Sequence, residues 1–184
     1  ADIIERVERP TPWVSPIGLT RKPKQPGEVR LCIDMRLPNL AIKRGRHITP
    51  TVDDIVGEIT GSKWFSKMDL RSGYHQIMLA PESRHVTTFS THMGLRRYKR
   101  LNFGISSAAE VFQDIIREVL AGLPGVLNVS DDILVHAPTL EGHLTQLRAV
   151  FQRLYESGLT LYQESTSFSK QRSGFLAISS PMRE

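Results

Sequence analysis

Prolines interrupt the apolar pattern of the first thirty positions, which predicts irregular chain with short extended pieces. The tetrapeptide Gln25-Pro26-Gly27-Glu28 is typical of a turn between two extended runs. After this turn, residues Val29–Asp34 alternate apolar and polar side chains, as a half-buried strand does. A helix is predicted over residues 49–61, because Thr49-Pro50-Thr51 suits a helix start and acidic residues follow in the first turn.

Apolar residues in the rest of the chain recur at either strand or helix spacing. The clearest helix begins near Ser106 or Ser107 and ends by Gly122. A second helix is capped by Thr139 and ends at Gly158. The remaining short apolar runs predict strands at Lys63–Asp69, His75–Leu79, Val86–Ser90, Leu95–Leu101, Val126–Val129 and Ile133–Val135.

The order of these elements indicates the fold class. Strands are followed by a helix, a hairpin, a second helix and a strand, which suits an antiparallel sheet with helices on one face. Such an arrangement is an α+β layer of the split βαβ, ferredoxin-like type. The length of 184 residues fits one domain, either single or two-lobed.

Charge and composition narrow the classes of partner. The chain has 24 basic and 19 acidic residues, and the whole excess lies in residues 1–50. This favours an anionic partner for that region, with a solvated basic surface as the alternative. No apolar run approaches the roughly 20 residues that cross a bilayer, and the first residues lack a signal-peptide core, so we expect an intracellular protein with no membrane partner. The single cysteine, Cys32, excludes an intrachain disulfide.

Three aspartates carry the main chemical prediction. Asp131 and Asp132 lie between two short strands, and neighbouring side chains on a regular strand point to opposite faces, so both serve one site only at a turn or strand end. Asp69 ends the apolar run that begins at Trp64. If the strands are neighbours, the carboxylates converge, and such oxygen ligands bind two Mg²⁺ or Mn²⁺ ions for phosphoryl transfer. The alternative is an acidic pair that only solvates a hairpin tip.

Two spaced histidine pairs raise the alternative of a zinc site. His85 precedes His92 by seven positions, and His136 precedes His143 by the same interval. Zinc sites usually add cysteine or carboxylate ligands at short spacing, and these pairs have neither. We therefore expect no zinc at either pair.

Several blocks of the sequence together resemble one family. Residues Phe65–Ile77 closely resemble the first catalytic block of gypsy-type LTR-retrotransposon reverse transcriptases. Further blocks follow in the family's order: Arg30–Arg36 with Pro38 and Asn39 is similar to the fingers strand, Thr87–Thr91 and Tyr98–Ile105 to the middle block, Phe112-Gln113 to the next helix, and Val129-Ser130-Asp131-Asp132 to the catalytic hairpin. The resemblance covers roughly residues 14–162.

This resemblance implies a fold and a domain organisation. It implies the palm of an RNA-directed DNA polymerase, with an antiparallel sheet and helices on one face, and a basic fingers subdomain. The implied fingers are residues 1–48 and 80–103, and the implied palm is residues 49–79 and 104–178. Together they form one reverse transcriptase domain at roughly 14–178, followed by a tail at 179–184. Thumb and RNase H domains of a longer polyprotein are implied partners.

The resemblance also implies an activity and its residues. The reaction is transfer of a dNMP to a primer 3′-hydroxyl on an RNA or DNA template, for retrotransposon replication. Asp69 and Asp131 are implied to bridge two Mg²⁺ or Mn²⁺ ions, and Asp132 to help position them. The implied dNTP-binding residues are Lys22, Lys24, Arg30, Tyr74, Phe103, Gly104 and Gln113, and the implied nucleic-acid-binding residues are Arg96, Arg97, Lys99 and Arg100.

Some of these residues have simpler interpretations. Tyr74 is alternatively a packed aromatic, and Arg30 alternatively pairs with Asp34 or Glu28 at the surface. The basic residues at positions 96–100 are alternatively a solvated strand face. These alternatives stay open from the sequence alone.

The end of the chain departs from the family pattern. After Leu161 the family usually has lysines and a cysteine, whereas this chain has Tyr162–Thr166. Residues Phe175–Ser180 only echo the family's primer-gripping hairpin. A second interpretation is therefore a truncated or degenerate copy that folds and binds nucleic acid or protein without polymerising. A third, another palm-type phosphotransferase such as a nucleotide cyclase, needs a phosphate-binding motif that the sequence lacks.

Overall fold

The computed structural model describes residues 2–21, 29–43, 45, 52–129, 132–163 and 166–171. The chain forms two compact units. The first unit comprises Ala1–Arg46 and Tyr74–Glu110, and the second comprises His47–Gly73 and Val111–Glu184. Among the described helices, none combines the length and apolar character needed to span a membrane.

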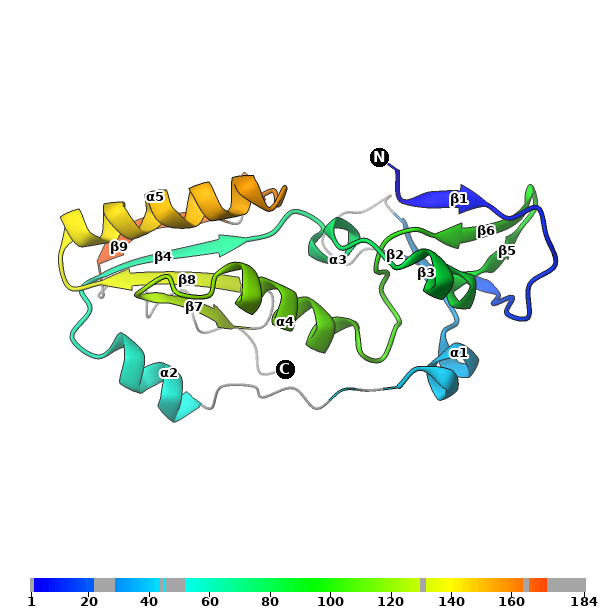
Figure 1. Cartoon of the computed structure of the whole chain (residues 1–184), viewed down its shortest axis with the longest axis horizontal. Coiled ribbons are helices and arrows are strands. Elements are labelled where there is room, and N and C mark those ends of the chain that lie inside the picture. The colour runs from blue at the N-terminus through cyan, green and yellow to red at the C-terminus, as the bar shows by residue number, and fades with distance from the viewer. Residues whose placement is uncertain are drawn as a thin grey trace. The chain divides into compact units, whose positions relative to one another are not determined.

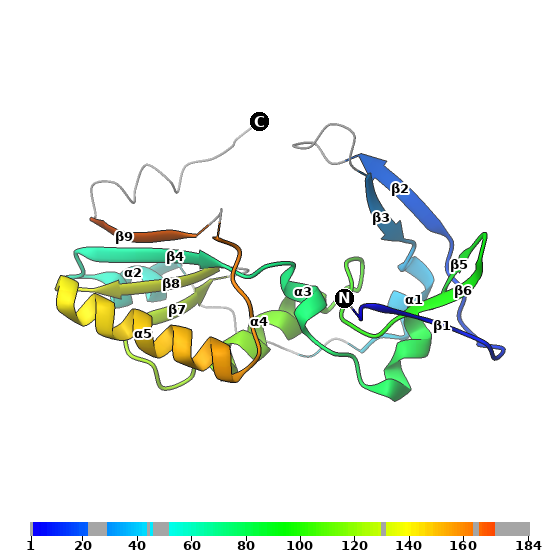
Figure 2. The same ribbon diagram turned by 90° about the horizontal axis from the view of Figure 1, so that it is seen from above.

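The first unit contains two small antiparallel sheets. One has the strand order β1 (Ile4–Arg6), β6 (Gly94–Tyr98), β5 (Phe89–Thr91), and the other is the pair β2 (Ile17–Arg21) and β3 (Val29–Ile33), seen in Figure 2. Strand β3 confirms the alternation predicted there, while the predicted turn at Gln25–Glu28 lies outside the described residues. The buried core of this unit consists of Ile33, Met35, Phe89 and Tyr98.

Helix α1 (Arg36–Ala41) follows directly after β3 and was not anticipated from the sequence. It is short and contains Pro38, which is tolerated because it lies in the first turn, where backbone amides lack helical partners. Pro38 is buried, so tertiary packing stabilises a helix that its own sequence disfavours.

Two strand predictions in the first unit need correction. The strand predicted at His75–Leu79 is wrong, because helix α3 (Gly73–Gln76) occupies its start and only Met78 makes an isolated bridge, to Arg100. The strand predicted at Val86–Ser90 starts at Phe89, because a 3₁₀ helix (Pro81–Thr87) precedes it. Thr88 donates its hydroxyl to the His85 carbonyl (2.7 Å), and such local bonds compete with a strand ladder.

The second unit is a four-stranded antiparallel sheet with helices, as predicted. The strand order is β7 (Val126–Val129), β8 (Asp132–Ala137), β4 (Trp64–Asp69), β9 (Ser167–Gln171), as Figure 1 shows. Its helices are α2 (Val52–Ile59), α4 (Ala108–Val119, whose first turn belongs to the first unit) and α5 (Leu140–Glu156). The α+β fold class and the predicted strands at β4, β7 and β8 are confirmed.

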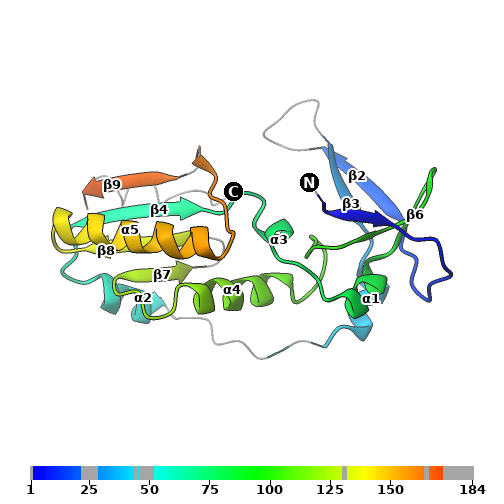
Figure 3. The same ribbon diagram turned by 45° about the horizontal axis from the view of Figure 1, so that its top comes forward.

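Helix α5 covers one face of this sheet, which Figure 3 shows. Its predicted cap is confirmed, because the Thr139 hydroxyl accepts a hydrogen bond from the Gly142 amide (3.2 Å). His143 on α5 is hydrogen-bonded to Ser66 on β4 (2.8 Å), so α5 lies on the face that carries Ser66. Side chains alternate along a strand, and Asp69 therefore points to the other face.

Candidate active site

Two of the three predicted aspartates are neighbours on adjacent strands of the sheet. Asp69 ends β4, Asp132 begins β8, and the two are direct partners in the antiparallel ladder. Side chains of directly opposed residues share one face, with Cβ atoms typically about 5 Å apart. The register between β4 and β8 thus places two carboxylates together at the end of both strands.

A lysine lies on the same face beside these carboxylates. The Lys67 ammonium is 2.7 Å from Oδ2 of Asp132, and the two side chains are 37% and 36% exposed. Lys67 precedes Asp69 by two positions on β4, so alternation puts all three charged groups on one face. The sequence interpretation gave no role to Lys67, although its position two residues before the strand-end aspartate was a usable signal.

The third aspartate, Asp131, lies outside the described residues, as does Ser130. Within the residues that the structure describes, no cluster of three or more His, Cys, Asp or Glu side chains is arranged to hold a metal ion. Among the described residues, Asp69 and Asp132 supply hard oxygen donors at one strand end, and such donors suit Mg²⁺ or Mn²⁺.

The chain after α5 runs beside this strand end. The Tyr162 amide donates to the Asp69 carbonyl (2.8 Å), and the Arg71 amide donates to the Thr160 carbonyl (3.0 Å). Leu161 forms a bridge with Leu70 between these two bonds. Gln163 is exposed and directly follows this anchored segment, so the segment that departs from the family pattern begins beside Asp69.

Two buried histidines support the sheet of the second unit through contacts with β4 and with the residue Ser62 before it. His136 on β8 is hydrogen-bonded through Nδ1 to Ser62 (2.9 Å), and its ring stacks on Phe65. His143 bonds Ser66 through Nε2. Burial lowers the pKa of both imidazoles, and the mutual proximity of the two rings lowers that of His143 further. Both histidines therefore pack in the sheet as neutral imidazoles.

In the first unit, three of the predicted nucleotide-binding residues lie together. The Tyr74 and Phe103 rings are 4.8 Å apart between centroids, and Phe103 is half exposed. Gly104 follows with φ +98°, and a Cβ there would meet Met35 Cγ at 3.1 Å. Glycine is therefore favoured at position 104, chiefly for its backbone conformation, because the flexible Met35 side chain would need only a small shift to admit a Cβ.

Asn39 on α1 holds the segment that contains Phe103 and Gly104. Its side-chain amide donates to the Gly104 carbonyl (2.9 Å), and its side-chain oxygen accepts from the Ser106 amide (2.9 Å). The sequence resemblance included Asn39 but assigned it no role. The structure gives it the role of fixing this loop.

The other predicted nucleotide-binding residues are less fully described. Lys22 and Lys24 lie outside the described residues, and Arg30 is described only through its backbone in β3. Asp34 is paired with Arg36, whose hydrogen bonds hold the pKa of this carboxyl at about 2. Gln113 lies on α4 in the second unit, where its carbonyl accepts from Asn128 Nδ2 (2.9 Å).

The four predicted nucleic-acid-binding residues lie on or directly after β6. The Arg97 guanidinium is 2.6 Å from the Glu5 carboxylate, and Lys99 pairs with Asp2. Arg96 donates to the Leu95 carbonyl, and Arg100 donates to the Gln76 carbonyl. Two of the four positive charges are therefore matched by acidic residues of the N-terminal segment.

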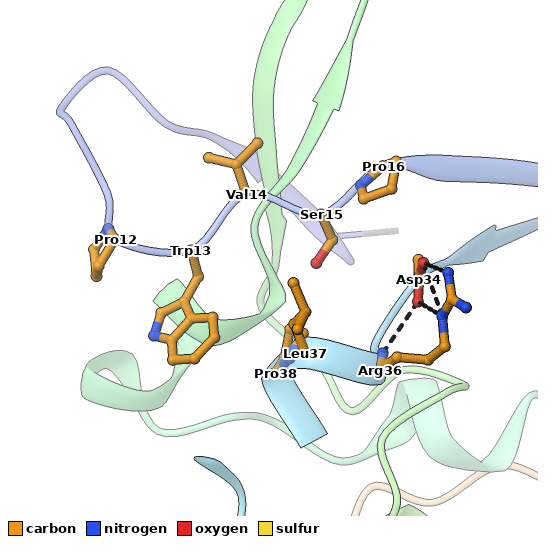
Figure 4. Close-up of a pocket in the computed structure, with 9 residues that line it drawn as sticks. All are labelled: Pro12, Trp13, Val14, Ser15, Pro16, Asp34, Arg36, Leu37 and Pro38. Atoms are coloured by element: carbon orange, nitrogen blue, oxygen red, sulfur yellow. Dashed lines mark hydrogen bonds and ion pairs between the residues drawn. The ribbon is translucent and has the colours of Figure 1, made fainter. Parts of the chain in front are cut away.

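The first unit also contains a cavity of about 490 Å³ between the N-terminal segment and α1. Figure 4 shows the Trp13 ring at one end and the Asp34–Arg36 pair at the other. Prolines and Leu37 form much of the wall between them. No residue predicted from the sequence as a site residue lines this cavity.

Comparisons with known proteins identify the family of this chain. Residues 21–179 match the family model described as reverse transcriptase (RNA-dependent DNA polymerase). The chain is 33% identical over 168 residues to the retrovirus-related Pol polyprotein from transposon 297 of Drosophila melanogaster, a match that covers 89% of the chain and 16% of the polyprotein. It is 32% identical over 153 residues to that from transposon gypsy of the same organism, which covers 81% of the chain and 15% of the polyprotein. The chain thus spans less than one fifth of the length of these relatives.

Solved structures show the same fold. The foamy viral protease-reverse transcriptase in complex with an RNA/DNA hybrid matches with a TM-score of 0.79 and 21% identity, over 91% of this chain and 22% of that chain. The foamy viral protease-reverse transcriptase dRH in complex with double-stranded DNA also matches with a TM-score of 0.79, at 22% identity, over 90% of this chain and 28% of that chain.

Proposed function

Because the chain belongs to the reverse transcriptase family, we propose that it is the fingers and palm portion of an RNA-directed DNA polymerase from a gypsy-type retrotransposon. The observation that carries this proposal is the pairing of Asp69 with Asp132 at the ends of two adjacent antiparallel strands. The reaction is attack of a primer 3′-hydroxyl on the α-phosphate of a dNTP. It forms a phosphodiester bond and releases pyrophosphate.

Divalent ions are the cofactors that this family generally uses. In this chain Asp69, Asp131 and Asp132 would hold two Mg²⁺ or Mn²⁺ ions, and the donor chemistry of the described pair fits them. When bound, such ions lower the charge on the reacting phosphate and activate the attacking oxygen. The sheet contributes fixed positions for the carboxylates, because the ladder between β4 and β8 sets their register.

The nucleotide would be held by residues from several of the sequence blocks that resemble the family. Arg30, Lys22 and Lys24 supply positive charge to the triphosphate, a role that guanidinium and ammonium groups suit. Tyr74 would lie under the sugar, where its ring leaves no room for a 2′-hydroxyl. Phe103, Gly104 and Gln113 would line the rest of the pocket. For Phe103 and Gly104 the support comes from the packing of Phe103 against Tyr74 and from the loop held by Asn39, whereas Gln113 rests on the family resemblance.

The partners follow from the same proposal. The template is RNA or DNA with an annealed primer, and the structural relatives include reverse transcriptases bound to an RNA/DNA hybrid and to double-stranded DNA. Arg96, Arg97, Lys99 and Arg100 would contribute to binding its backbone. Thumb and RNase H domains of a longer polyprotein would complete the enzyme.

Primer extension under single-turnover conditions tests the proposal. The chain in excess over a labelled primer on an RNA template, with Mn²⁺ and dNTPs, should extend the primer slowly. Asp69→Asn should abolish extension, because the amide loses the charge that holds the ions. Glu156→Gln is a matched control, since it removes a carboxylate on α5 and should leave the rate unchanged.

Two results would argue against the proposal. Extension that survives Asp69→Asn would remove this residue from the active site. Binding of primer–template without any extension by the parent chain would instead favour a degenerate copy that retains only the fold.

A further inference from the structure

The ion pair between Lys67 and Asp132 lies within the carboxylate pair that the proposed function uses. Lys67 and Asp69 are on the same strand and face, and Asp132 is the direct ladder partner of Asp69. The Lys67 ammonium is 2.7 Å from Asp132 Oδ2, and both side chains are about one third exposed. A positive charge of the protein itself therefore sits beside two adjacent carboxylates.

The charge of Lys67 affects both the stability of the metal-free protein and its affinity for a metal ion. Carboxylates held close together repel one another, and this repulsion is relieved by any cation between or beside them. An ammonium and a divalent ion offer the same relief, and they repel each other at short range. The lysine should therefore stabilise the metal-free protein and weaken the binding of a metal ion.

We propose that Lys67 is a positioning residue that holds the Asp132 carboxylate in the metal-free protein and competes with the divalent cation for it. This inference rests on the proposed function, because it assigns the pair Asp69 and Asp132 to a metal site. It makes metal binding to this chain an exchange, in which the contact from Lys67 to Asp132 Oδ2 loosens as the cation arrives. The lysine thereby sets the concentration of divalent ion at which the site fills.

Mn²⁺ binding to the full chain tests the proposal directly. Lys67→Met keeps the length of the side chain and removes its charge. The dissociation constant for Mn²⁺, measured by calorimetry without nucleic acid or dNTP, should fall about tenfold relative to the parent. In EDTA the same variant should unfold about 2 °C lower, because the carboxylates lose their compensating charge.

Two further variants separate position from charge. Lys63→Met removes the same charge from the residue just before β4 and should leave both measurements close to the parent, because Lys63 is exposed and lies at the opposite end of β4 from Asp69. Lys67→Arg keeps a positive charge and should restore both the weaker Mn²⁺ binding and the metal-free stability.

The outcomes distinguish this inference from the proposed function. If Asp69→Asn abolishes Mn²⁺ binding while Lys67→Met binds Mn²⁺ with the parent's affinity or more weakly, the competition by Lys67 is refuted and the metal site stands. If the parent binds no Mn²⁺, or if Asp69→Asn leaves binding unchanged, the metal site itself is refuted, and this inference with it.

Discussion

Tyr74 lies in an aromatic contact of the first unit. Its ring packs on Phe103 at 4.8 Å between centroids, and Gly104 follows directly in a conformation that favours glycine. If this ring lies under the sugar of the incoming nucleotide, Tyr74→Val makes room for a 2′-hydroxyl. We expect the ratio of dNTP to rNTP incorporation to fall at least tenfold.

The measurement is single-turnover incorporation of each nucleotide by parent and variant. Tyr155→Val is the control, because Tyr155 is a tyrosine on α5 that is 81% exposed. An unchanged ratio in Tyr74→Val would leave Tyr74 as a packing residue of the first unit.

Gln163 belongs to the segment that departs from the family pattern, and it lies next to the strand end that carries Asp69. The preceding residue, Tyr162, donates its amide to the Asp69 carbonyl, so position 163 begins next to the strand end. A lysine can both neutralise charge on a leaving pyrophosphate and donate a proton to it, whereas glutamine does neither. Gln163→Lys should therefore raise the single-turnover extension rate by roughly tenfold or more.

The control for this gain is Gln152→Lys, which adds the same charge to an exposed position on α5. An equal gain in both variants would point to general attraction of nucleic acid. Ser165, the second position where the family usually has lysine, lies outside the described residues.

At the scale of elements, the loop between α4 and β7 depends on one glycine. A Cβ at Gly125 (φ +63°) would lie 2.4 Å from the His136 carbonyl oxygen, and the Gly125 carbonyl accepts from the His136 amide. Backbone cannot move away from such a contact cheaply. Gly125→Ala should lower the free energy of unfolding by about 2–4 kcal/mol.

Gly122 in the same loop provides the comparison. It also has positive φ (+79°), but a Cβ there would meet no atom within 4 Å. Gly122→Ala should cost only about 1 kcal/mol for the backbone conformation. Urea unfolding of both variants measures the difference, and equal losses would contradict the contact with His136.

The contact between β4 and α5 predicts a pH dependence. Burial lowers the pKa of His143 and His136 below the ordinary value of 6.5, so the unfolded chain takes up protons at a higher pH than the folded chain. Their contribution to stability is fully present above about pH 6.5 and is lost as the pH falls toward the lowered pKa of the folded state. The slope is at most about 1.4 kcal/mol per pH unit for each histidine.

Urea unfolding at pH 7.5, 6.5 and 5.5 measures this slope. His143→Gln keeps a polar partner for Ser66 and should reduce the slope by about one third, because it removes one of three histidines whose pKa burial lowers, the others being His75 and His136. His92→Gln, at an exposed position, should leave the slope as it is in the parent. The same slope in all three proteins would exclude the buried histidines as its source.

The sequence predicted those elements whose local pattern and tertiary packing agree. Strands β4, β7 and β8 follow apolar alternation or short apolar runs, and α5 begins at the predicted Thr139 cap. The prediction failed at His75–Leu79, because ring packing of Tyr74 and His75 against Phe103 and Tyr98 favours a helical turn there. The spacing of Lys67 before Asp69 indicated a shared face, but its ion pair with Asp132 also depends on the register between β4 and β8, which a single sequence does not contain.

At the scale of the whole molecule, we expect net charge to govern the binding of nucleic acid. The net charge is +5, and its excess lies in residues 1–50. We expect the chain to bind primer–template with a log–log salt slope of roughly −2 to −4, which corresponds to two to four phosphate contacts. Fluorescence anisotropy between 50 and 200 mM KCl measures this slope.

The residues on and after β6 refine this expectation. Arg96→Gln should reduce the salt slope by about one if Arg96 contacts a phosphate. Arg97→Gln should have a smaller effect, because Glu5 already neutralises Arg97 in the free protein. If neither substitution changes the slope, this segment does not follow the nucleic-acid backbone.

The ladder that aligns Asp69 has a consequence for synthesis of the chain. Strand β4 takes both of its partners, β8 and β9, from far later in the sequence. During synthesis the apolar residues of β4 emerge before either partner strand, and unpaired apolar segments of this kind favour aggregation. A polypeptide that ends before β8 would therefore expose the apolar residues of β4 and would have no residue opposite Asp69 in the ladder. The alignment of Asp69 with Asp132 therefore forms only after β8 has been synthesised.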